Sequence, residues 1–284
     1  MFDSVWRRFD VQHNRPYLIN CSILFTELPL LERPAAAAAA GFDAVEFWWP
    51  FSSAAPGDTE VDRFVAAVKD AGVQLVGLNF AAGDMPGGDR GLMSWPGRSD
   101  EFHDSVAVAV AIADQLETGA FNALYGNRLD ETTPEEQDDL AAANLARAAE
   151  AADRIGAVVL VEPVSGSPRY PLLTAADVMT VIQRVQQHAG VDNLRLLADL
   201  YHLTVNGDDL AALVAQHAGH IGHVQIADAP GRHEPGTGEL DLDHHLRALE
   251  NAGYSGWVGL EYSPSTSTEE SLGWLPRERR AGTA

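Results

Sequence analysis

Four oxygen-bearing side chains lie at or near the ends of apolar runs in the second half of the sequence. Glu162 ends AVVLVE, Asp199 ends LRLLAD, Gln225 lies late in IGHVQIAD, and Glu261 ends WVGLE. Oxygen ligands suit hard divalent ions such as Mg²⁺ or Mn²⁺, whereas zinc sites usually recruit histidine or cysteine. Carboxylates that converge repel one another unless a cation neutralises them. If the fold brings the four together, they predict a Mg²⁺ or Mn²⁺ site. Taken singly, each acid can instead cap a helix or pair with a surface arginine.

Five further side chains are candidates for substrate contacts. They are His202, Arg232, Asn79, Glu46 and Arg90. His202 follows Asp199 by three residues in DLYH, so it can bind a substrate oxygen or move a proton, or it can be an ordinary loop histidine. Arg232 lies in the Gly-rich segment DAPGRHEPGTGE and can hold a carboxylate in a bidentate fork. Phosphate binding by this segment ranks lower, because it contains no lysine and no second arginine.

Hydrophobic periodicity predicts the elements that must position these residues. Eight apolar runs bounded by Gly, Pro, Asn or Asp predict strands at 17–24, 44–48, 73–80, 120–125, 157–161, 194–198, 221–227 and 257–262. Ala- and Leu-rich segments of helical periodicity alternate with them, at 30–40, 60–71, 99–117, 134–155, 175–188, 208–217 and 242–251. Strict alternation requires parallel strands joined by right-handed crossovers, and eight such units match a closed (β/α)₈ TIM barrel.

We therefore expect a single TIM-barrel domain over 1–284, with the barrel at about 17–275 and short terminal extensions. An open doubly wound sheet is the alternative, but the first run is not followed by GxGxxG. The active site of a TIM barrel lies at the carboxyl ends of its strands. The four candidate ligands would then come from the fifth to eighth strands, which are neighbours in the ring.

Composition and charge limit the partners. Nineteen Lys and Arg against 41 Asp and Glu give a net charge of −22, which disfavours nucleic acid and anionic membranes. Cys21 is the only cysteine, so no intrachain disulfide can form. Residues 1–10 lack the apolar core of a signal peptide, and no charge-free stretch approaches the ~20 residues of a membrane span. A cytoplasmic protein that binds neither membrane nor nucleic acid is expected, and homo-oligomerisation stays open.

Several longer segments occur in the order found in one family. They are NCSILFTELPLLERPAAAAAAGFDAVEFWWPF, NFAAGDMPGGDRG, ADLYH, HVQIADAPGRHEPGTGELD, GYSGWVGLEY and GWL. From about Asn20 to Leu275 the chain resembles the hydroxypyruvate isomerase family of xylose-isomerase-like barrels. The resemblance implies a divalent metal held at Glu162, Asp199, Gln225 and Glu261, with Glu162 and Glu261 as the acid/base pair, and substrate contacts from His202 and Arg232.

Two positions depart from related patterns. The family often has Ile-Asn where this chain has Val164-Ser165, and Gln225 stands where sugar epimerases of related fold use histidine. The expected function is interconversion of a small anionic hydroxy-oxo acid, hydroxypyruvate with tartronate semialdehyde, by proton transfer through an enediolate. The alternatives are a 2-oxo-tetronate isomerase, a sugar 3-epimerase with the same metal site, and a structural metal-binding barrel without activity. The acidic composition contradicts a barrel endonuclease.

Overall fold

The strands form a closed parallel barrel in chain order, from β1 round to β8. The computed structural model describes residues 11–282. The strands are Tyr17–Asn20 (β1), Ala44–Phe47 (β2), Gln74–Asn79 (β3), Ala120–Asn122 (β4), Val158–Val161 (β5), Leu194–Asp199 (β6), Ile221–Ile226 (β7) and Val258–Leu260 (β8). Because β8 pairs with β1, the ring has no free edge. The predicted (β/α)₈ TIM barrel is confirmed, and the open sheet is excluded.

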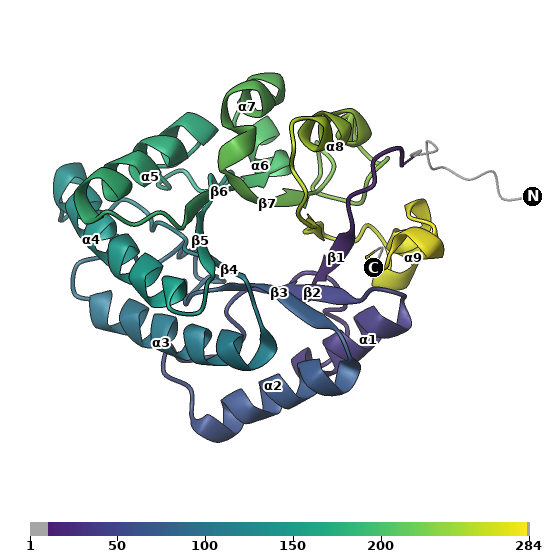
Figure 1. Ribbon diagram of the computed structural model, residues 1–284, viewed down its shortest axis with the longest axis horizontal. Coiled ribbons are helices and arrows are strands. Elements are labelled where there is room, and N and C mark those ends of the chain that lie inside the picture. Colours follow the sequence, from purple (N-terminus) through teal and green to yellow (C-terminus); the bar gives the residue numbers. More distant parts are fainter. Residues whose placement is uncertain (1–10, 283–284) are drawn as a thin grey trace, which may run out of the picture.

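Helices cover the outside of the barrel (Figure 1). The α-helices are Arg33–Ala39 (α1), Asp58–Ala71 (α2), Ser99–Leu116 (α3), Pro134–Asp153 (α4), Ala175–Ala189 (α5), Leu200–Val205 (α6), Leu210–His217 (α7), Leu242–Asn251 (α8) and Thr268–Ser271 (α9). Short 3₁₀ turns lie at Leu30–Glu32, Ala218–His220, Leu272–Trp274 and Arg277–Arg279. Local sequence explains several boundaries: Thr133 and Thr174 form capping boxes that start α4 and α5, and Gly72 and Gly190 end α2 and α5 in the left-handed conformation.

The structure differs from the sequence prediction mainly in the strands, which are shorter than the apolar runs. The run 17–24 continues for four residues beyond β1, because the chain turns there while Cys21 and Leu24 still pack in the core. The predicted helix 30–40 divides into a 3₁₀ turn and α1. The short helices α6 and α9 were not predicted, since four or six residues carry too little periodicity.

The space inside the barrel is divided between apolar and polar side chains. A small separate cluster of Ala120, Leu160 and Leu197, with Val158 packed against it, lies on strands β4 to β6. Buried polar residues lie on β1, β2, β3, β4, β6 and β7. The lone Cys21 is buried, and burial raises the pKa of its thiol, so it packs as a small hydrophobe.

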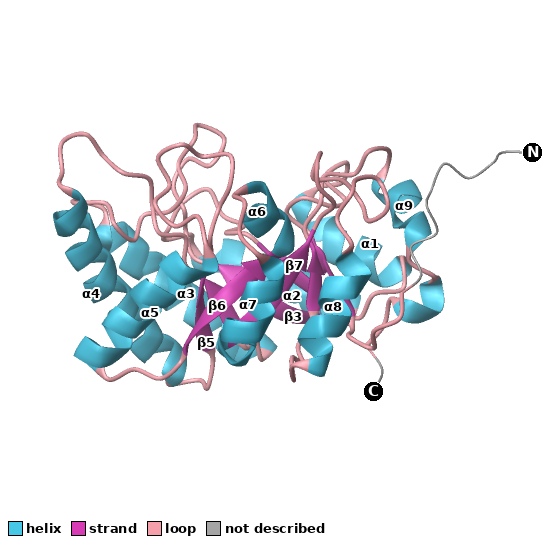
Figure 2. Ribbon diagram, turned by 90° about the horizontal axis from the view of Figure 1, so that it is seen from above, coloured by secondary structure: helices cyan, strands magenta, loops and turns pink. Residues whose placement is uncertain are grey.

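The loops that follow the strands gather at one end of the barrel (Figure 2). The loop between β7 and α8 is organised by Asp228, whose carboxylate accepts hydrogen bonds from the backbone N–H groups of Ala229, Gly236 and Leu240. Gly238 is required there, because a Cβ at this position would lie 2.4 Å from the Ala229 carbonyl oxygen. This folded loop carries Arg232 towards the barrel mouth.

Residues 1–10, for which the sequence predicts no signal peptide, lie outside the described residues. Over 11–282, no helix has the length and apolar character needed to cross a bilayer.

Candidate active site

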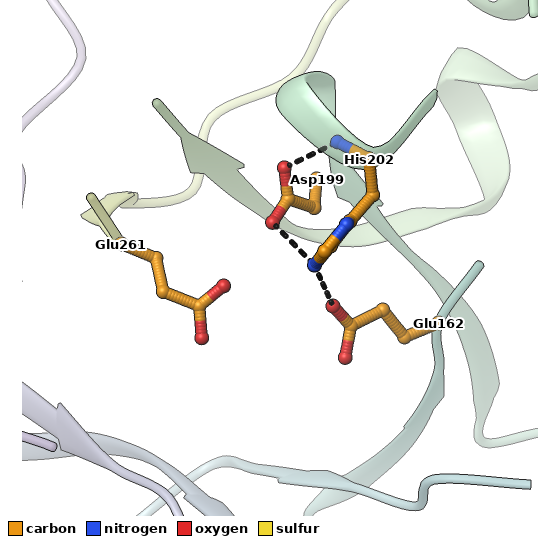
Figure 3. Close-up of side chains that lie close together, drawn as sticks. All are labelled: Glu162, Asp199, His202 and Glu261. Carbon is orange, nitrogen blue, oxygen red and sulfur yellow. Dashed lines mark hydrogen bonds and ion pairs between the residues drawn. The ribbon is translucent and has the colours of Figure 1, made fainter. Parts of the chain in front are cut away.

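Four ionisable side chains converge at the carboxyl end of the barrel (Figure 3). Glu162 follows β5, Asp199 ends β6, His202 lies in α6, and Glu261 follows β8. One ligand atom from each lies within 4.8 Å of the others, and all four residues are buried. The structure therefore brings together three of the four predicted metal ligands and one predicted substrate contact.

Asp199 uses its two carboxylate oxygens differently. Oδ1 accepts hydrogen bonds from the backbone N–H groups of Tyr201 and His202, at 2.8 and 3.1 Å, and so caps α6. Oδ2 is buried and has no hydrogen-bond partner within residues 11–282. The helix-capping role that the sequence offered as the ordinary interpretation is thus real, and it leaves one oxygen available to a ligand.

His202 is held in one tautomer. Its Nδ1 accepts the backbone N–H of Ser165 at 3.1 Å, and the Ser165 Oγ lies 2.7 Å from the same nitrogen. A backbone N–H can only donate, so the neutral ring carries its proton on Nε2. Nε2 lies 3.6 Å from Asp199 Oδ2 and 3.9 Å from Glu162 Oε1. In this arrangement His202 is a hydrogen-bond donor towards the site rather than a metal ligand.

The two glutamates are each oriented by an asparagine at the end of a strand. Asn122, the last residue of β4, donates to Glu162 Oε2 at 2.7 Å. Asn20, the last residue of β1, donates to Glu261 Oε1 at 3.1 Å. Glu261 also accepts the Trp48 indole N–H at 2.6 Å and pairs with Arg232 at 3.0 Å. These contacts fix both carboxylates in place before a substrate arrives.

Burial and mutual repulsion shift the acidity of the cluster. Burial, then the charges of Glu261 and Asp199, raises the pKa of Glu162 well above its ordinary value. Burial raises the pKa of Glu261 to about 7 although Arg232 opposes the shift, and burial also raises the pKa of Asp199. Burial, then Arg232, lowers the pKa of His202 to about 3. The site thus holds a neutral imidazole and three carboxyl groups that are harder to ionise than in water.

Gln225 stands beside Asp199 on the inner wall of the barrel, since the two are register partners across β6 and β7. Its Nε2 donates to Glu46 Oε1 at 2.8 Å. Its Oε1 is buried and, within the described chain, accepts no hydrogen bond. Two adjacent strands therefore each present a buried oxygen without a donor, which is costly in an apolar interior and is relieved by a cation. The residues present fit a hard divalent metal.

A pocket of about 380 Å³ opens over the cluster. Its walls include Glu162, Glu261, His202, Arg232, Asn79 and Arg90 from the predicted site, together with Trp48, Met85, Pro86, Leu124, Val164 and Ser165. Arg90 is held by its Nη1, which donates to the carbonyl oxygens of Met85 and Asp89. Arg232 has a positive φ of 60° and packs its guanidinium over the Tyr201 ring. Both cations therefore have defined positions at the pocket.

Glu46 is placed differently from the sequence expectation of a substrate contact. Glu46 is not one of the described residues that line the pocket. Its carboxylate contacts His223, Gln225 and Asn20 instead. His223 was expected to be a satisfied core residue, and its 2.7 Å contact with Glu46 confirms this.

The sequence analysis did not identify Asn20, Asn122 and Ser165 as site residues. It did not decide whether Trp48 packs in the core or forms a wall of the pocket. Both asparagines end strands, which is the signal that identified the acids. They were hidden because the apolar runs continue past them, to 24 and to 125. Ser165 was noticed only as a departure from the family pattern, and its partner His202 lies 37 residues away.

Comparisons with known proteins identify the family. Residues 34–278 match the family described as Xylose isomerase-like TIM barrel. A Streptomyces coelicolor protein named "Putative hydroxypyruvate isomerase" is 54% identical over 93% of this chain and 96% of its own length. The hydroxypyruvate isomerase of Escherichia coli is 34% identical, over 90% and 96% of the two chains. The 2-oxo-tetronate isomerase of Cupriavidus necator is also 34% identical, over 91% and 96%.

Solved structures show the same fold. The crystal structure of AP endonuclease, family 2, from Brucella melitensis superposes with a TM-score of 0.84 at 33% identity, covering 93% of this chain and 99% of that one. The 3-keto-D-glucoside 4-epimerase of Escherichia coli superposes with a TM-score of 0.71 at 20% identity, covering 93% and 99%. At that identity the second comparison concerns the fold alone.

Proposed function

The chain belongs to the xylose isomerase-like TIM barrel family, and we propose that it is a metal-dependent isomerase that interconverts hydroxypyruvate and tartronate semialdehyde. The observation that carries the proposal is the pair Glu162 and Glu261, two buried carboxyl groups whose ligand atoms lie within 4.8 Å, in a pocket that also holds two arginines. Relatives named as hydroxypyruvate isomerases, similar over nearly their whole length, support the choice of substrate.

The metal would be held by Glu162, Asp199, Gln225 and Glu261, as Mg²⁺ or Mn²⁺. All four offer oxygen, and two of those oxygens, Asp199 Oδ2 and Gln225 Oε1, have no donor in the described part of the chain. When bound, the metal supplies Lewis acidity towards the carbonyl and hydroxyl oxygens of the substrate. His202 is assigned to the substrate instead, because its Nε2 carries the proton and can donate to an oxygen.

Proton transfer between adjacent substrate carbons is assigned to the two glutamates. One takes the C–H proton to give the enediolate, and the other delivers a proton to the neighbouring carbon. In the metal-free chain burial raises the pKa of Glu261 to about 7, so its surroundings favour the protonated form more than water does. Asn122 and Asn20 hold the two carboxylates in position for the transfer.

The carboxylate of the substrate is assigned to the cationic side of the pocket, where Arg232 and Arg90 lie. Arg232 already neutralises Glu261, so it orients that glutamate as well as attracting an anion. Local cations must overcome the net charge of −22, and a Debye length of ~8 Å at physiological salt screens most of the remote acids. Asn79 contributes a further polar contact to the pocket.

Two other isomerase functions remain as alternatives. A 2-oxo-tetronate is one carbon longer, and the similarity to a 2-oxo-tetronate isomerase favours it as the second candidate. A sugar 3-epimerase would use the same glutamate pair, but the two arginines favour an anionic substrate over a neutral sugar. The acidic chain disfavours the DNA substrate that the name of the Brucella melitensis structure indicates.

A substrate panel tests the proposal. Protein treated with chelator and reloaded with Mn²⁺ or Mg²⁺ is assayed with hydroxypyruvate, a 2-oxo-tetronate and a ketohexose, in D₂O as well as in water. Metal-dependent turnover of hydroxypyruvate with solvent deuterium in the product is expected. Faster turnover of the tetronate or the sugar would identify that compound as the substrate in place of hydroxypyruvate. A product without deuterium would indicate a hydride shift instead of proton transfer. Retained binding of metal with no turnover of any of the three would favour the structural barrel.

A further inference from the structure

Glu46 is a buried carboxylate that no step of the proposed reaction uses. It lies on β2 with 4% of its surface exposed. Three side chains from two other strands point donors at it: Asn20 from β1, and His223 and Gln225 from β7. The Oε2 contact to His223 is 2.7 Å, and the Oε1 contacts to Gln225 and Asn20 are 2.8 and 3.1 Å. Both oxygens of Glu46 are therefore satisfied.

The backbone makes room for this arrangement at one glycine. A Cβ on Gly259 of β8 would lie 2.7 Å from Glu46 Oε1 and 3.0 Å from Gln225 Cγ. A side chain at 259 would therefore displace the carboxylate of Glu46 from Gln225.

We propose that Glu46 is a positioning residue that fixes the amide of Gln225 with its oxygen turned to the metal. The inference rests on the proposed metal site. An ionised carboxylate only accepts hydrogen bonds, so the amide nitrogen of Gln225 must face Glu46. Turning the amide over would place oxygen against oxygen at 2.8 Å. The carbonyl oxygen is left on the other side of the amide, where no described residue donates a hydrogen bond to it. Asp199 is the register partner of Gln225 on the neighbouring strand.

The contacts of Asn20 and His223 explain why Glu46 cannot turn away from Gln225. His223 holds the second carboxylate oxygen, and Asn20 shares the first with Gln225. Asn20 also donates to Glu261, so the same network reaches a second proposed metal ligand. Partners that hold ligands in this way commonly change metal affinity 10–100-fold when they are removed.

Binding of Mn²⁺ to metal-free protein, measured by loss of the free-ion electron paramagnetic resonance signal, tests the inference without any assay of turnover. Glu46→Met removes both acceptors and is expected to weaken Mn²⁺ binding about tenfold. Glu46→Gln keeps a carbonyl oxygen for Gln225 and Asn20, while its amide can donate to His223 in the other tautomer. It should bind Mn²⁺ within about twofold of the wild type.

A double-mutant cycle assigns the effect to Gln225. Gln225→Ala removes the ligand, and adding E46M to it should weaken Mn²⁺ binding no further, because the residue through which Glu46 acts is gone. Asn193→Ala, which removes amide contacts to the carbonyl oxygens of Ala149 in α4 and Ala157 just before β5, is the control and should bind Mn²⁺ like the wild type. If E46M does not fold by circular dichroism, E46M/H223L leaves no histidine without a partner and carries the same comparison.

Three results would overturn the inference while leaving the proposed function intact: normal Mn²⁺ binding by E46M, equal weakening by E46M and E46Q, or additive effects of E46M and Q225A. Equal weakening would mean that Glu46 acts through its charge rather than by orienting the amide. Failure of the wild type itself to bind Mn²⁺ would overturn the metal site and this inference together.

Discussion

Glu46 and Asp199 are both buried carboxylates on the inner wall of the barrel, yet their surroundings differ. Every oxygen of Glu46 accepts a hydrogen bond from a side chain. Asp199 satisfies only Oδ1, by capping α6. Within residues 11–282 its Oδ2 accepts no hydrogen bond, and His202 Nε2 lies 3.6 Å from it. Burial alone therefore does not separate a structural acid from a ligand. Between these two residues the number of donors differs, whereas Glu261, another proposed ligand, resembles Glu46 in that both of its oxygens accept hydrogen bonds.

The physical reason is the cost of desolvation. A carboxylate that leaves water must recover hydrogen bonds from the protein, and an acceptor without a donor costs about 1–3 kcal/mol. The network around Glu46 meets that requirement with side chains. In the cluster of Glu162, Asp199 and Glu261, Asp199 Oδ2 accepts no hydrogen bond. Burial raises the pKa of all three groups, and repulsion between the acids raises those of the two glutamates further.

The largest effect is expected at the glutamate pair. Glu162→Gln or Glu261→Gln removes a group that exchanges the proton, and turnover should fall by about 10²- to 10⁴-fold while the protein stays folded. Steady-state kinetics with hydroxypyruvate, together with circular dichroism, measures this. Full activity in both variants would show that the two glutamates do not act as the acid and base.

Metal should stabilise the wild type but not Asp199→Asn. At 100 times its dissociation constant, a bound ion adds about 2.7 kcal/mol to the free energy of unfolding. The asparagine oxygen can still cap α6, so D199N should melt like the metal-free wild type, and added Mn²⁺ should raise only the wild-type melting temperature. A similar increase in D199N would show that Oδ2 is not a ligand.

The metal-free protein should lose stability as pH rises through the carboxyl titration. The pKa of Glu261 is raised from 4.5 to about 7, so between these values the folded chain holds a proton that the unfolded chain has lost. The contribution of Glu261 is complete below pH 4.5 and disappears as pH passes 7. Urea unfolding at several pH values should therefore show the wild type declining relative to E261Q across this window. A constant difference between the two would contradict the shift.

The smallest effect is expected at Ser165. Ser165→Ala removes the hydroxyl near His202 Nδ1 but keeps the backbone N–H that fixes the tautomer. The loss of one hydrogen bond, about 0.5–1.5 kcal/mol, should raise KM by roughly tenfold or less and leave kcat nearly unchanged. A large fall in kcat would mean that the hydroxyl, rather than the N–H, holds the imidazole.

The fold was predictable because alternation of strand and helix is a property of sequence periodicity. Apolar runs mark strands whether or not every residue pairs, so the order and number of the strands were correct while their ends were not. The same error hid Asn20 and Asn122. Glu162, Asp199 and Glu261 were found because in each of their runs the polar residue does fall at the end of the strand.

The contacts between site residues could not be predicted in this way. Ser165 meets His202, and Glu46 meets Gln225 across 179 positions of sequence, through the curvature of the ring rather than through any local pattern. The sequence can give the residue types at the barrel mouth. It cannot show which acid faces donors and which faces open space, and that distinction separates the role of Glu46 from the role of Asp199.

The pairing of β8 with β1 has a consequence for how the site comes into being. Asn20 and Glu261, 241 positions apart, meet only when the first and last strands join. During synthesis, a nascent chain that has emerged as far as β7 already contains Glu162, Asp199 and Gln225. It still lacks Glu261, the glutamate that Asn20 orients. The site is therefore completed in a single step, when the ring closes. Fragments that lack β8 should have no activity rather than weak activity.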